Sequence, residues 1–548
     1  MTETTSSIKV AFIGMGPRGL GALEALVESC ASSGRPIEIN IFDELDLGGA
    51  GPNFDPVQSY LGLLNTPLRD VEIKPVLDLP CGGFQDWLKG QGQPDRDHFA
   101  PRSKLGSYLQ RRLHDVMDTY KTNLTVTFHK AHAVSLHQCG AAWMVSTEDD
   151  DYGPFDEVLL VLGQPRTAID KQWEAWIDHA QDSGACCMQA YPDRHVLAAA
   201  KGWANRNVGI RGLGLSTFDV LRYLTVGQGG TFKNGTYQKS GAEPARIFAF
   251  SLDGQPPFPK PVDAAHDDHF TLTKSEADQF AVALHGAATH GPERALDLIC
   301  GVLAGPVARI GSNLGADFDS PDVREWLETE CSSAGDQEAG DPVATLKHGI
   351  DMADGTVPPT VGYVLGQIWR KLQNELRVGF NSAPASAETA KAIIDFDEGL
   401  KRYSYGPPLS SARELLALIE CGQVSLAVVD DPSISLIEDG WRLSDDAQAT
   451  VSVMINAVLP PPSLAKITDP LIAQLRSQSL LCELYEGSGA KALPDGQIMN
   501  SEGDCSKGLS LLGRLALGSV IAVDSVHDCF GASTVRWAQG VIHRRQTP

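Results

Sequence analysis

The sequence predicts an α/β fold with two Rossmann-like dinucleotide-binding domains and a large, mainly helical insertion. Two segments, beginning near residues 8 and 207, have the order of a parallel βαβ unit: an apolar strand, a glycine-rich turn and a helix. A third segment, from about residue 275 to residue 420, has apolar residues mainly at helical spacing. The length of 548 residues favours about three or four domains.

The first unit begins with Ile8–Ile13, a continuous apolar run that is typical of a buried parallel strand. It leads into the turn Gly14-Met-Gly16-Pro-Arg-Gly19 and then into residues 20–30, which have helical spacing. A second strand, 37–42, ends at Asp43. Glycines in this pattern allow a tight turn, the approach of a pyrophosphate and close packing of the helix, and the acid can bind ribose hydroxyls. We expect a dinucleotide site here; an ordinary tight turn is the alternative.

Loops and regular elements alternate through the rest of the first half. Residues 105–120 have the pattern of a helix. Alternating side chains at 124–128 and 141–146 indicate a small antiparallel sheet. The apolar run 155–162 predicts another buried strand, which Gly163 closes.

The second unit has a short strand at Val208–Arg211, the turn Gly212-Leu-Gly214-Leu-Ser216 and a helical start at 217–224. Its third turn position is not glycine, so an ordinary turn is again the alternative. Two dinucleotide sites in one chain usually hold a flavin and a nicotinamide, because one accepts the hydride that the other supplies. The pair of turns therefore predicts an oxidoreductase.

These patterns divide the chain into three regions. We expect residues 1–200, completed by 490–548, to form the FAD-binding domain. Residues 201–270 with 425–489 should form the NAD(P)H-binding domain. Residues 271–424 should form a mainly helical substrate or lid region.

Charge and composition restrict the partners. The chain has 45 Lys and Arg against 69 Asp and Glu, a formal net charge of −24. Nucleic acids and anionic membranes attract basic surfaces, so we expect a small-molecule substrate and neither of those partners. We find no apolar run long enough to span a membrane and no signal peptide at the start. The 11 cysteines include no CxxC and no metal-ligand spacing. We therefore expect a cytoplasmic protein without a metal. The oligomeric state cannot be inferred.

The two glycine turns also carry a family resemblance. Ile13–Gly19 with Glu24 resembles the opening of the bacterial FAD/NAD(P)-binding proteins related to class B, N-hydroxylating flavin monooxygenases. Ile210–Asp219, followed by Gly229–Phe232, is similar to the nicotinamide-side motif of that family. Val161–Pro165 stands where relatives carry an Ala-Thr-Gly turn. The match is scattered over nearly the whole chain.

The resemblance implies a set of cofactor-binding residues. On the FAD side they are Gly14, Gly16, Pro17, Arg18 and Gly19 at the pyrophosphate, Asp43 at the ribose, Asn65 near the flavin ring, Arg102 on the cofactor loop, Ala133 at the adenine, and Asp524 returning from the C-terminus. Gly163 would mark the crossing between the two domains. On the nicotinamide side they are Gly212, Gly214, Leu215 and Ser216.

The sequence departs from the family where relatives bind the 2′-phosphate of NADPH. Ala242 and Asp253 stand where relatives often carry basic residues, and arginines usually hold that phosphate. Arg222, Lys233 or Arg246 could substitute for them. The resemblance implies NADPH, and NADH is not excluded.

The resemblance implies a monooxygenase in which NAD(P)H reduces FAD and the reduced flavin delivers oxygen from O₂ to an amine nitrogen of a small amino-acid-like substrate. Such chemistry needs a dry pocket rather than a catalytic dyad, and the sequence indicates no catalytic residue. Two alternatives use the same sites: a flavin dehydrogenase or reductase without oxygen insertion, and a non-enzymatic flavin-binding redox sensor.

Overall fold

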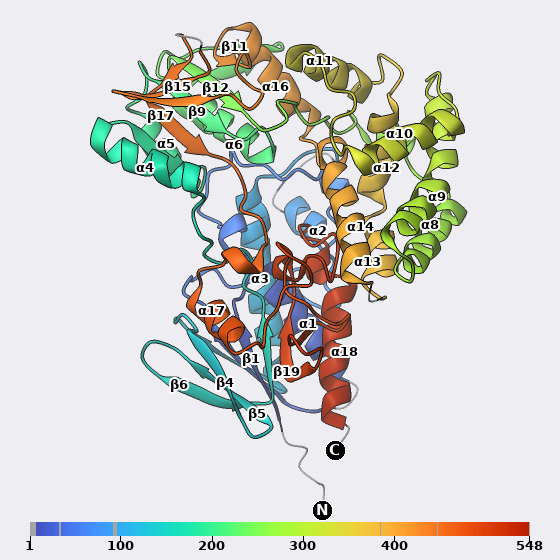
Figure 1. Ribbon diagram of the computed structural model, residues 1–548. Coiled ribbons are helices and arrows are strands. Elements are labelled where there is room, and N and C mark those ends of the chain that lie inside the picture. Colours follow the sequence, from blue (N-terminus) through green and yellow to red (C-terminus); the bar gives the residue numbers. More distant parts are fainter. Residues whose placement is uncertain are drawn as a thin grey trace, which may run out of the picture.

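A computed structural model describes residues 7–31, 34–90, 92, 96–383, 385–445 and 448–546. A six-stranded sheet in the order β18-β19-β7-β1-β2-β3 forms the centre of the first domain, in the lower half of Figure 1. All neighbours are parallel except β18 and β19. The strands are β1 (Ile8–Ile13), β2 (Ile37–Phe42), β3 (Leu124–His129), β7 (Glu157–Leu160), β18 (Gln497–Met499) and β19 (Cys505–Leu511).

The strand order reverses beside β1, which pairs with β2 on one side and with β7 on the other. Such a reversal opens a crevice at the carboxyl ends of the strands, where α/β proteins bind ligands. Helix α1 starts directly at this crevice and packs against the C-terminal helix α18 (Figure 1). The helices of this domain are α1 (Pro17–Ala31), α2 (Phe84–Lys89), α3 (Arg102–Tyr120), α17 (Pro470–Ser477) and α18 (Ala532–Gln546).

A separate antiparallel sheet lies in the first domain and consists of β4 (Ser135–Cys139), β5 (Ala142–Ser146) and β6 (Asp151–Phe155). The sequence correctly places 141–146 in it but wrongly includes 124–128. That segment is β3, the parallel edge strand of the main sheet. An edge strand is half covered, so it shows the same alternation as a strand of a small antiparallel sheet.

A five-stranded parallel sheet in the order β13-β12-β9-β17-β8 forms the second domain, in the upper part of Figure 1. Its order reverses beside β9, so it has a crevice of the same kind. The strands are β8 (Cys186–Gln189), β9 (Asn207–Arg211), β12 (Arg246–Phe250), β13 (Val424–Ser425) and β17 (Val453–Asn456). The remaining elements are α4 (Lys171–Ser183), α5 (Asp193–Ala200), α6 (Leu215–Leu224), the hairpin β10 (Thr231–Lys233) with β11 (Thr236–Gln238), and β14 (Ile434–Ile437), β15 (Gly440–Leu443) and β16 (Thr450–Val451).

Two of the expected domain boundaries differ from the structure. Strand β8 pairs with β17 of the second sheet, so the chain crosses between the domains after β7 and not at residue 200. Residues 464–481, expected in the second domain, contribute α17 and its neighbours to the core of the first. Both differences have one cause: the chain crosses between the two sheets more often than the expected domain boundaries allow.

The helical block lies to the right of the second domain in Figure 1 and shares its hydrophobic core. By length and composition alone α9 could span a membrane, which the sequence analysis did not expect. About half of the apolar stretch is buried, and α9 packs against α8, α10, α12 and α14. The helices are α7 (Ala264–Asp268), α8 (Lys274–Ala287), α9 (Pro292–Asn313), α10 (Ser320–Ser332), α11 (Pro342–Ala353), α12 (Val361–Lys371), α13 (Gln373–Phe380), α14 (Ala387–Gly399), α15 (Lys401–Ser404) and α16 (Leu409–Glu420).

Candidate active site

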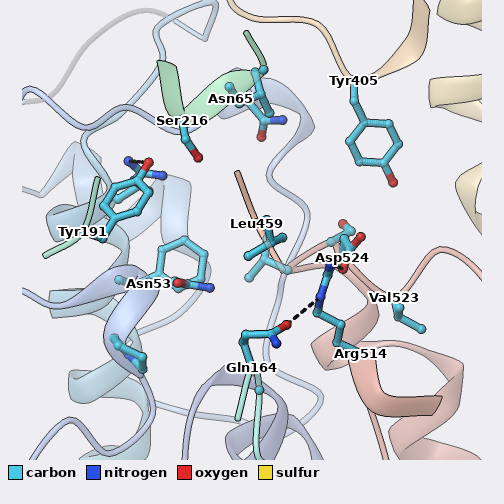
Figure 2. Close-up of a pocket in the computed structure, with 18 of the residues that line it drawn as sticks. Asn53, Asn65, Gln164, Tyr191, Ser216, Tyr405, Leu459, Arg514, Val523 and Asp524 are labelled. Atoms are coloured by element: carbon cyan, nitrogen blue, oxygen red, sulfur yellow. Dashed lines mark hydrogen bonds and ion pairs between the residues drawn. The ribbon is translucent and has the colours of Figure 1, made fainter. Parts of the chain in front are cut away.

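One large cleft of about 2360 Å³ lies between the two domains and the helical block. Both glycine turns line it, Gly14–Arg18 from the first domain and Gly212–Ser216 from the second. Figure 2 shows side chains from all three regions around this space: Asn53 and Asn65, Ser216, and Tyr405. The topology explains why the two glycine turns line the same cleft, because each turn follows the central strand of its sheet at the crevice.

The three glycines of the first turn serve different purposes. Gly14 has φ +93, and a Cβ there would lie 2.7 Å from the Val161 carbonyl oxygen of the neighbouring strand end. A Cβ on Gly19 would press on Met15 Sδ at 3.0 Å. Gly16 is different: its nearest neighbour would be the Cα of Gly51, at 3.9 Å. No protein atom therefore prevents a side chain at position 16. The free space beside Gly16 fits a bound phosphate group.

Asp43 stands at the end of β2 and is tied into this turn. One carboxylate oxygen accepts a bond from the Met15 amide at 2.8 Å, and the other accepts one from the Leu45 amide at 2.9 Å. Each oxygen keeps a further acceptor position, and the half-buried side chain lines the cleft. Asp43 therefore fits the predicted ribose ligand.

The second turn is more open than the first. Gly212 has φ +121, and a Cβ there would meet the Ala457 backbone at 3.3 Å. Gly214 caps α6 without a side-chain bond, and a Cβ there would meet no atom within 4 Å. Leu215 and Ser216 begin α6, whose free amides and positive dipole end face the cleft. These features fit the phosphates of a second nucleotide.

Comparison with known proteins bears on the cofactors of this cleft. A family model described as FAD-NAD(P)-binding matches residues 11–165, which contain the first glycine turn, Asp43 and β7. The chain is an FAD- and NAD(P)-binding flavoprotein. This confirms the resemblance and the cofactor classes predicted from the two turns.

Two curated proteins are similar to the flavoprotein over most of its length. A nitrosuccinic acid synthase from Aspergillus oryzae is 26% identical over 539 residues, covering 86% of this chain and 81% of its own. An L-aspartate N-monooxygenase (nitrosuccinate-forming) from Streptomyces davaonensis is 24% identical over 563 residues, covering 86% and 85%. Among solved structures, ornithine hydroxylase from Pseudomonas aeruginosa aligns with a TM-score of 0.48 and 9% identity, covering 98% of this chain and all of its own.

Arg18 lines the cleft with the first turn, and its guanidinium binds the C-terminal segment. Its guanidinium forms an ion pair with the buried Asp528 at 2.6 Å and donates to the Val523 carbonyl at 3.1 Å. Pro17 and Arg18 are the first two residues of α1, and this position turns the arginine towards the C-terminal segment. Arg18 therefore holds that segment against α1, and its predicted role at the pyrophosphate stays a prediction.

Arg102 connects the two domains. It begins α3 in the first domain and forms an ion pair with Asp219 on α6 of the second. The Tyr191 hydroxyl donates to the same carboxylate at 2.6 Å, and the Arg102 guanidinium stacks 5.2 Å from the Tyr191 ring centroid. Burial opposes the charge of Arg102, but Asp219 keeps its pKa raised. The predicted cofactor-loop residue is thus also an interdomain tie.

The other predicted residues line the cleft. Ala133 is buried and lines the cleft, and Gly163, with φ +65, lies where the chain leaves the first sheet. Asn65 is half-buried and faces the pocket in Figure 2. Asp524 accepts hydrogen bonds from Arg514 at 2.5 Å and from Lys401 at 3.3 Å. Burial opposes the charge of the Asp524 carboxylate, but these two cations hold its pKa below the usual range.

The suggested replacements for the 2′-phosphate arginines are not positioned for that role. Arg246 starts β12, at the end of the strand opposite the cleft, and Lys233 on β10 is not among the residues that line the cleft. Arg222 does line the cleft, but its guanidinium is bound to Glu414 at 2.7 Å. Arg211, which the sequence analysis missed, does line the cleft at the end of β9. The choice between NADPH and NADH therefore rests on the resemblance.

The sequence analysis also missed a cationic wall on the far side of the cleft, defined here as Lys260, Arg370, Lys371 and Arg377. Lys371 and Arg370 form ion pairs with Asp267 of α7. Burial, reinforced by the Arg370 cation, lowers the pKa of Lys260 to about 7. The sequence shows these residues only as separate basic positions in an acidic chain. It does not show that folding brings them to one wall of the cleft.

Proposed function

We propose that the flavoprotein is an NAD(P)H- and O₂-dependent monooxygenase that oxygenates the amine nitrogen of a small dicarboxylic amino acid, with aspartate as the first candidate. The observation that carries this is the similarity, over more than four-fifths of each chain, to two proteins named for nitrosuccinate formation. The single cleft shared by two nucleotide-type turns supports the same function.

The cationic wall supports a dicarboxylic substrate. The chain has a net charge of −24, yet its cleft concentrates positive side chains on the helical block and the segment before it. Carboxylates are bound most strongly by charge-assisted bonds in partly desolvated sites. An amino acid with two carboxylates is therefore a better match to this wall than one with an apolar or basic side chain.

The chain's own residues perform positioning tasks in this reaction. The first turn and Asp43 would hold FAD, which supplies the hydride-accepting and oxygen-activating chemistry, and the second turn would hold the nicotinamide. Arg102 and Asp219 tie α3 of the first domain to α6, the helix that follows the second turn. The helical block forms the third side of the cleft and would help to keep water from the reacting nitrogen.

The direct test is a screen of amino acids for stimulation of NAD(P)H oxidation in air. Aspartate should raise the rate of oxygen uptake and yield an N-oxygenated product by mass spectrometry, with little hydrogen peroxide. NAD(P)H oxidation that passes electrons to an acceptor other than O₂ and yields no N-oxygenated product would favour the reductase. A flavin that neither nicotinamide reduces would favour the redox sensor. The cytoplasmic location stays a prediction.

A further inference from the structure

Lys260 is a buried cation that lines the cleft. Lys260 is only 5% exposed and lies in the segment that leads from β12 to the helical block. The backbone is fixed there, because the Lys260 amide donates to the Pro407 carbonyl at 3.0 Å. The ammonium donates to the Gly406 carbonyl at 2.5 Å. One neutral acceptor leaves two of its three N–H donors unused.

Lys260 differs from the other cations of the wall in having no carboxylate of its own. Arg370 and Lys371 pair with Asp267, and Arg377 approaches Asp528 at 3.5 Å. Within the described residues, no carboxylate oxygen lies within 4 Å of the Lys260 ammonium. A buried charge without a partner is costly, and the lowered pKa of Lys260 reflects that cost.

Arg402 is a second buried cation of the cleft. It lies on α15, lines the cleft and donates through its terminal nitrogens to backbone carbonyls, among them Gln337 at 2.9 Å. Its Nε is buried and has no partner in the described structure. The Arg402 carbonyl accepts a bond from the Phe258 amide at 3.0 Å, which ties the Lys260 segment to α15. Two buried cations with unused donors therefore line the cleft.

We propose that Lys260 binds a carboxylate of the substrate and thereby makes the cleft selective for dicarboxylic amino acids. This rests on the proposed function and names the residue that sets its substrate class. A bound carboxylate would supply the missing counter-ion and accept the unused N–H donors. The nucleotide phosphates are the other anions that could reach Lys260, so the test separates them from the substrate.

The first test compares Lys260→Met with the holoenzyme. We expect the KM for aspartate to rise about 10- to 100-fold, because the variant loses one charged hydrogen bond to the substrate. The KM for the nicotinamide should stay unchanged. Preference for aspartate over asparagine should fall, and Lys260→Arg should restore part of it. Lys274→Met is the matched control, since Lys274 is exposed on α8 and its ion pair is with Asp278 of the same helix. FAD absorbance and thermal melting verify folding, and Lys260→Gln replaces any variant that fails.

An unchanged KM for aspartate in a folded Lys260 variant would overturn the proposal. So would a rise confined to the nicotinamide KM, which would assign Lys260 to a nucleotide phosphate.

A second test uses binding alone, with succinate as the probe because it has two carboxylates and no amine. The charged groups that face Lys260 are Arg370 from α12, Asp267 from α7 and Asp70 from the 3-10 helix Leu68–Asp70. A carboxylate at Lys260 should raise its pKa above about 7, so succinate binding should take up protons at pH 7.5. Calorimetry in two buffers measures this uptake, and Lys260→Met should abolish it. Lys260-dependent succinate binding in an enzyme that does not oxygenate aspartate would uphold this inference and reject the proposed function. Succinate binding that Lys260→Met leaves unchanged would reject the inference.

Discussion

The two glycine turns have the same local fold but different surroundings. The first is enclosed: Asp43 bonds to its backbone, a Cβ on Gly14 would meet the Val161 carbonyl, and the C-terminal segment packs over the start of α1. The second is open: no atom would meet a Cβ on Gly214, and the neighbouring Leu252 is 85% exposed. An enclosed site suits a cofactor that stays bound, and an open one suits a co-substrate that must leave after each turnover.

Substitution at the enclosed turn should have the largest effect. Gly16→Val places a side chain where the pyrophosphate is expected, so the purified variant should lack FAD and all activity. The ratio of flavin to protein absorbance measures this, and circular dichroism verifies the fold. A fully flavin-loaded Gly16→Val protein would contradict the assignment of the first turn.

The same substitution at the open turn should separate the two sites. Gly214→Val should retain FAD but lose reduction by NADPH or NADH, because the blocked site lies in the other domain. Stopped-flow spectra should show a flavin that stays oxidised with either nicotinamide and is bleached by dithionite. Normal reduction kinetics would remove the second turn from the nicotinamide site.

Asp43→Ala tests what holds the cofactor at the enclosed turn. Removing a charged hydrogen bond to the ribose should weaken FAD binding by roughly 1.5–3 kcal/mol, or about 10- to 150-fold in Kd. Titration of the apoprotein with FAD gives the affinity. If the affinity does not change, the neighbouring Glu44 becomes the candidate ligand.

Asp219→Asn tests the tie between the two turns and should have the smallest effect. The variant keeps the shape of the side chain but leaves Arg102 without a full counter-charge, which should lower the stability by about 1–3 kcal/mol. FAD content should be normal, and flavin reduction should slow a few-fold as the turns lose their fixed orientation. Thermal melting and stopped-flow reduction measure the two effects. A variant with normal stability and normal reduction would show that Arg102 does not couple the domains.

Several features could be predicted because they are written in contiguous residues. Each turn needs only a strand, its glycines and a helix next to one another, and the Gly14–Asp43 unit lies within one short segment. The helical block could be predicted from spacing for the same reason. Strand β3 was misassigned because alternation reports half-burial and does not report which neighbour a strand pairs with.

The sequence by itself therefore determined the two nucleotide-type turns, the α/β class and the flavin and nicotinamide cofactors. Only the tertiary structure decided that β8 joins the second sheet, that Arg18 faces Asp528, and that Lys260 lies on a cationic wall of the shared cleft. The physical reason is distance along the chain. Backbone turns are fixed by neighbouring residues, whereas burial, counter-ions and cleft walls depend on segments that only folding brings together.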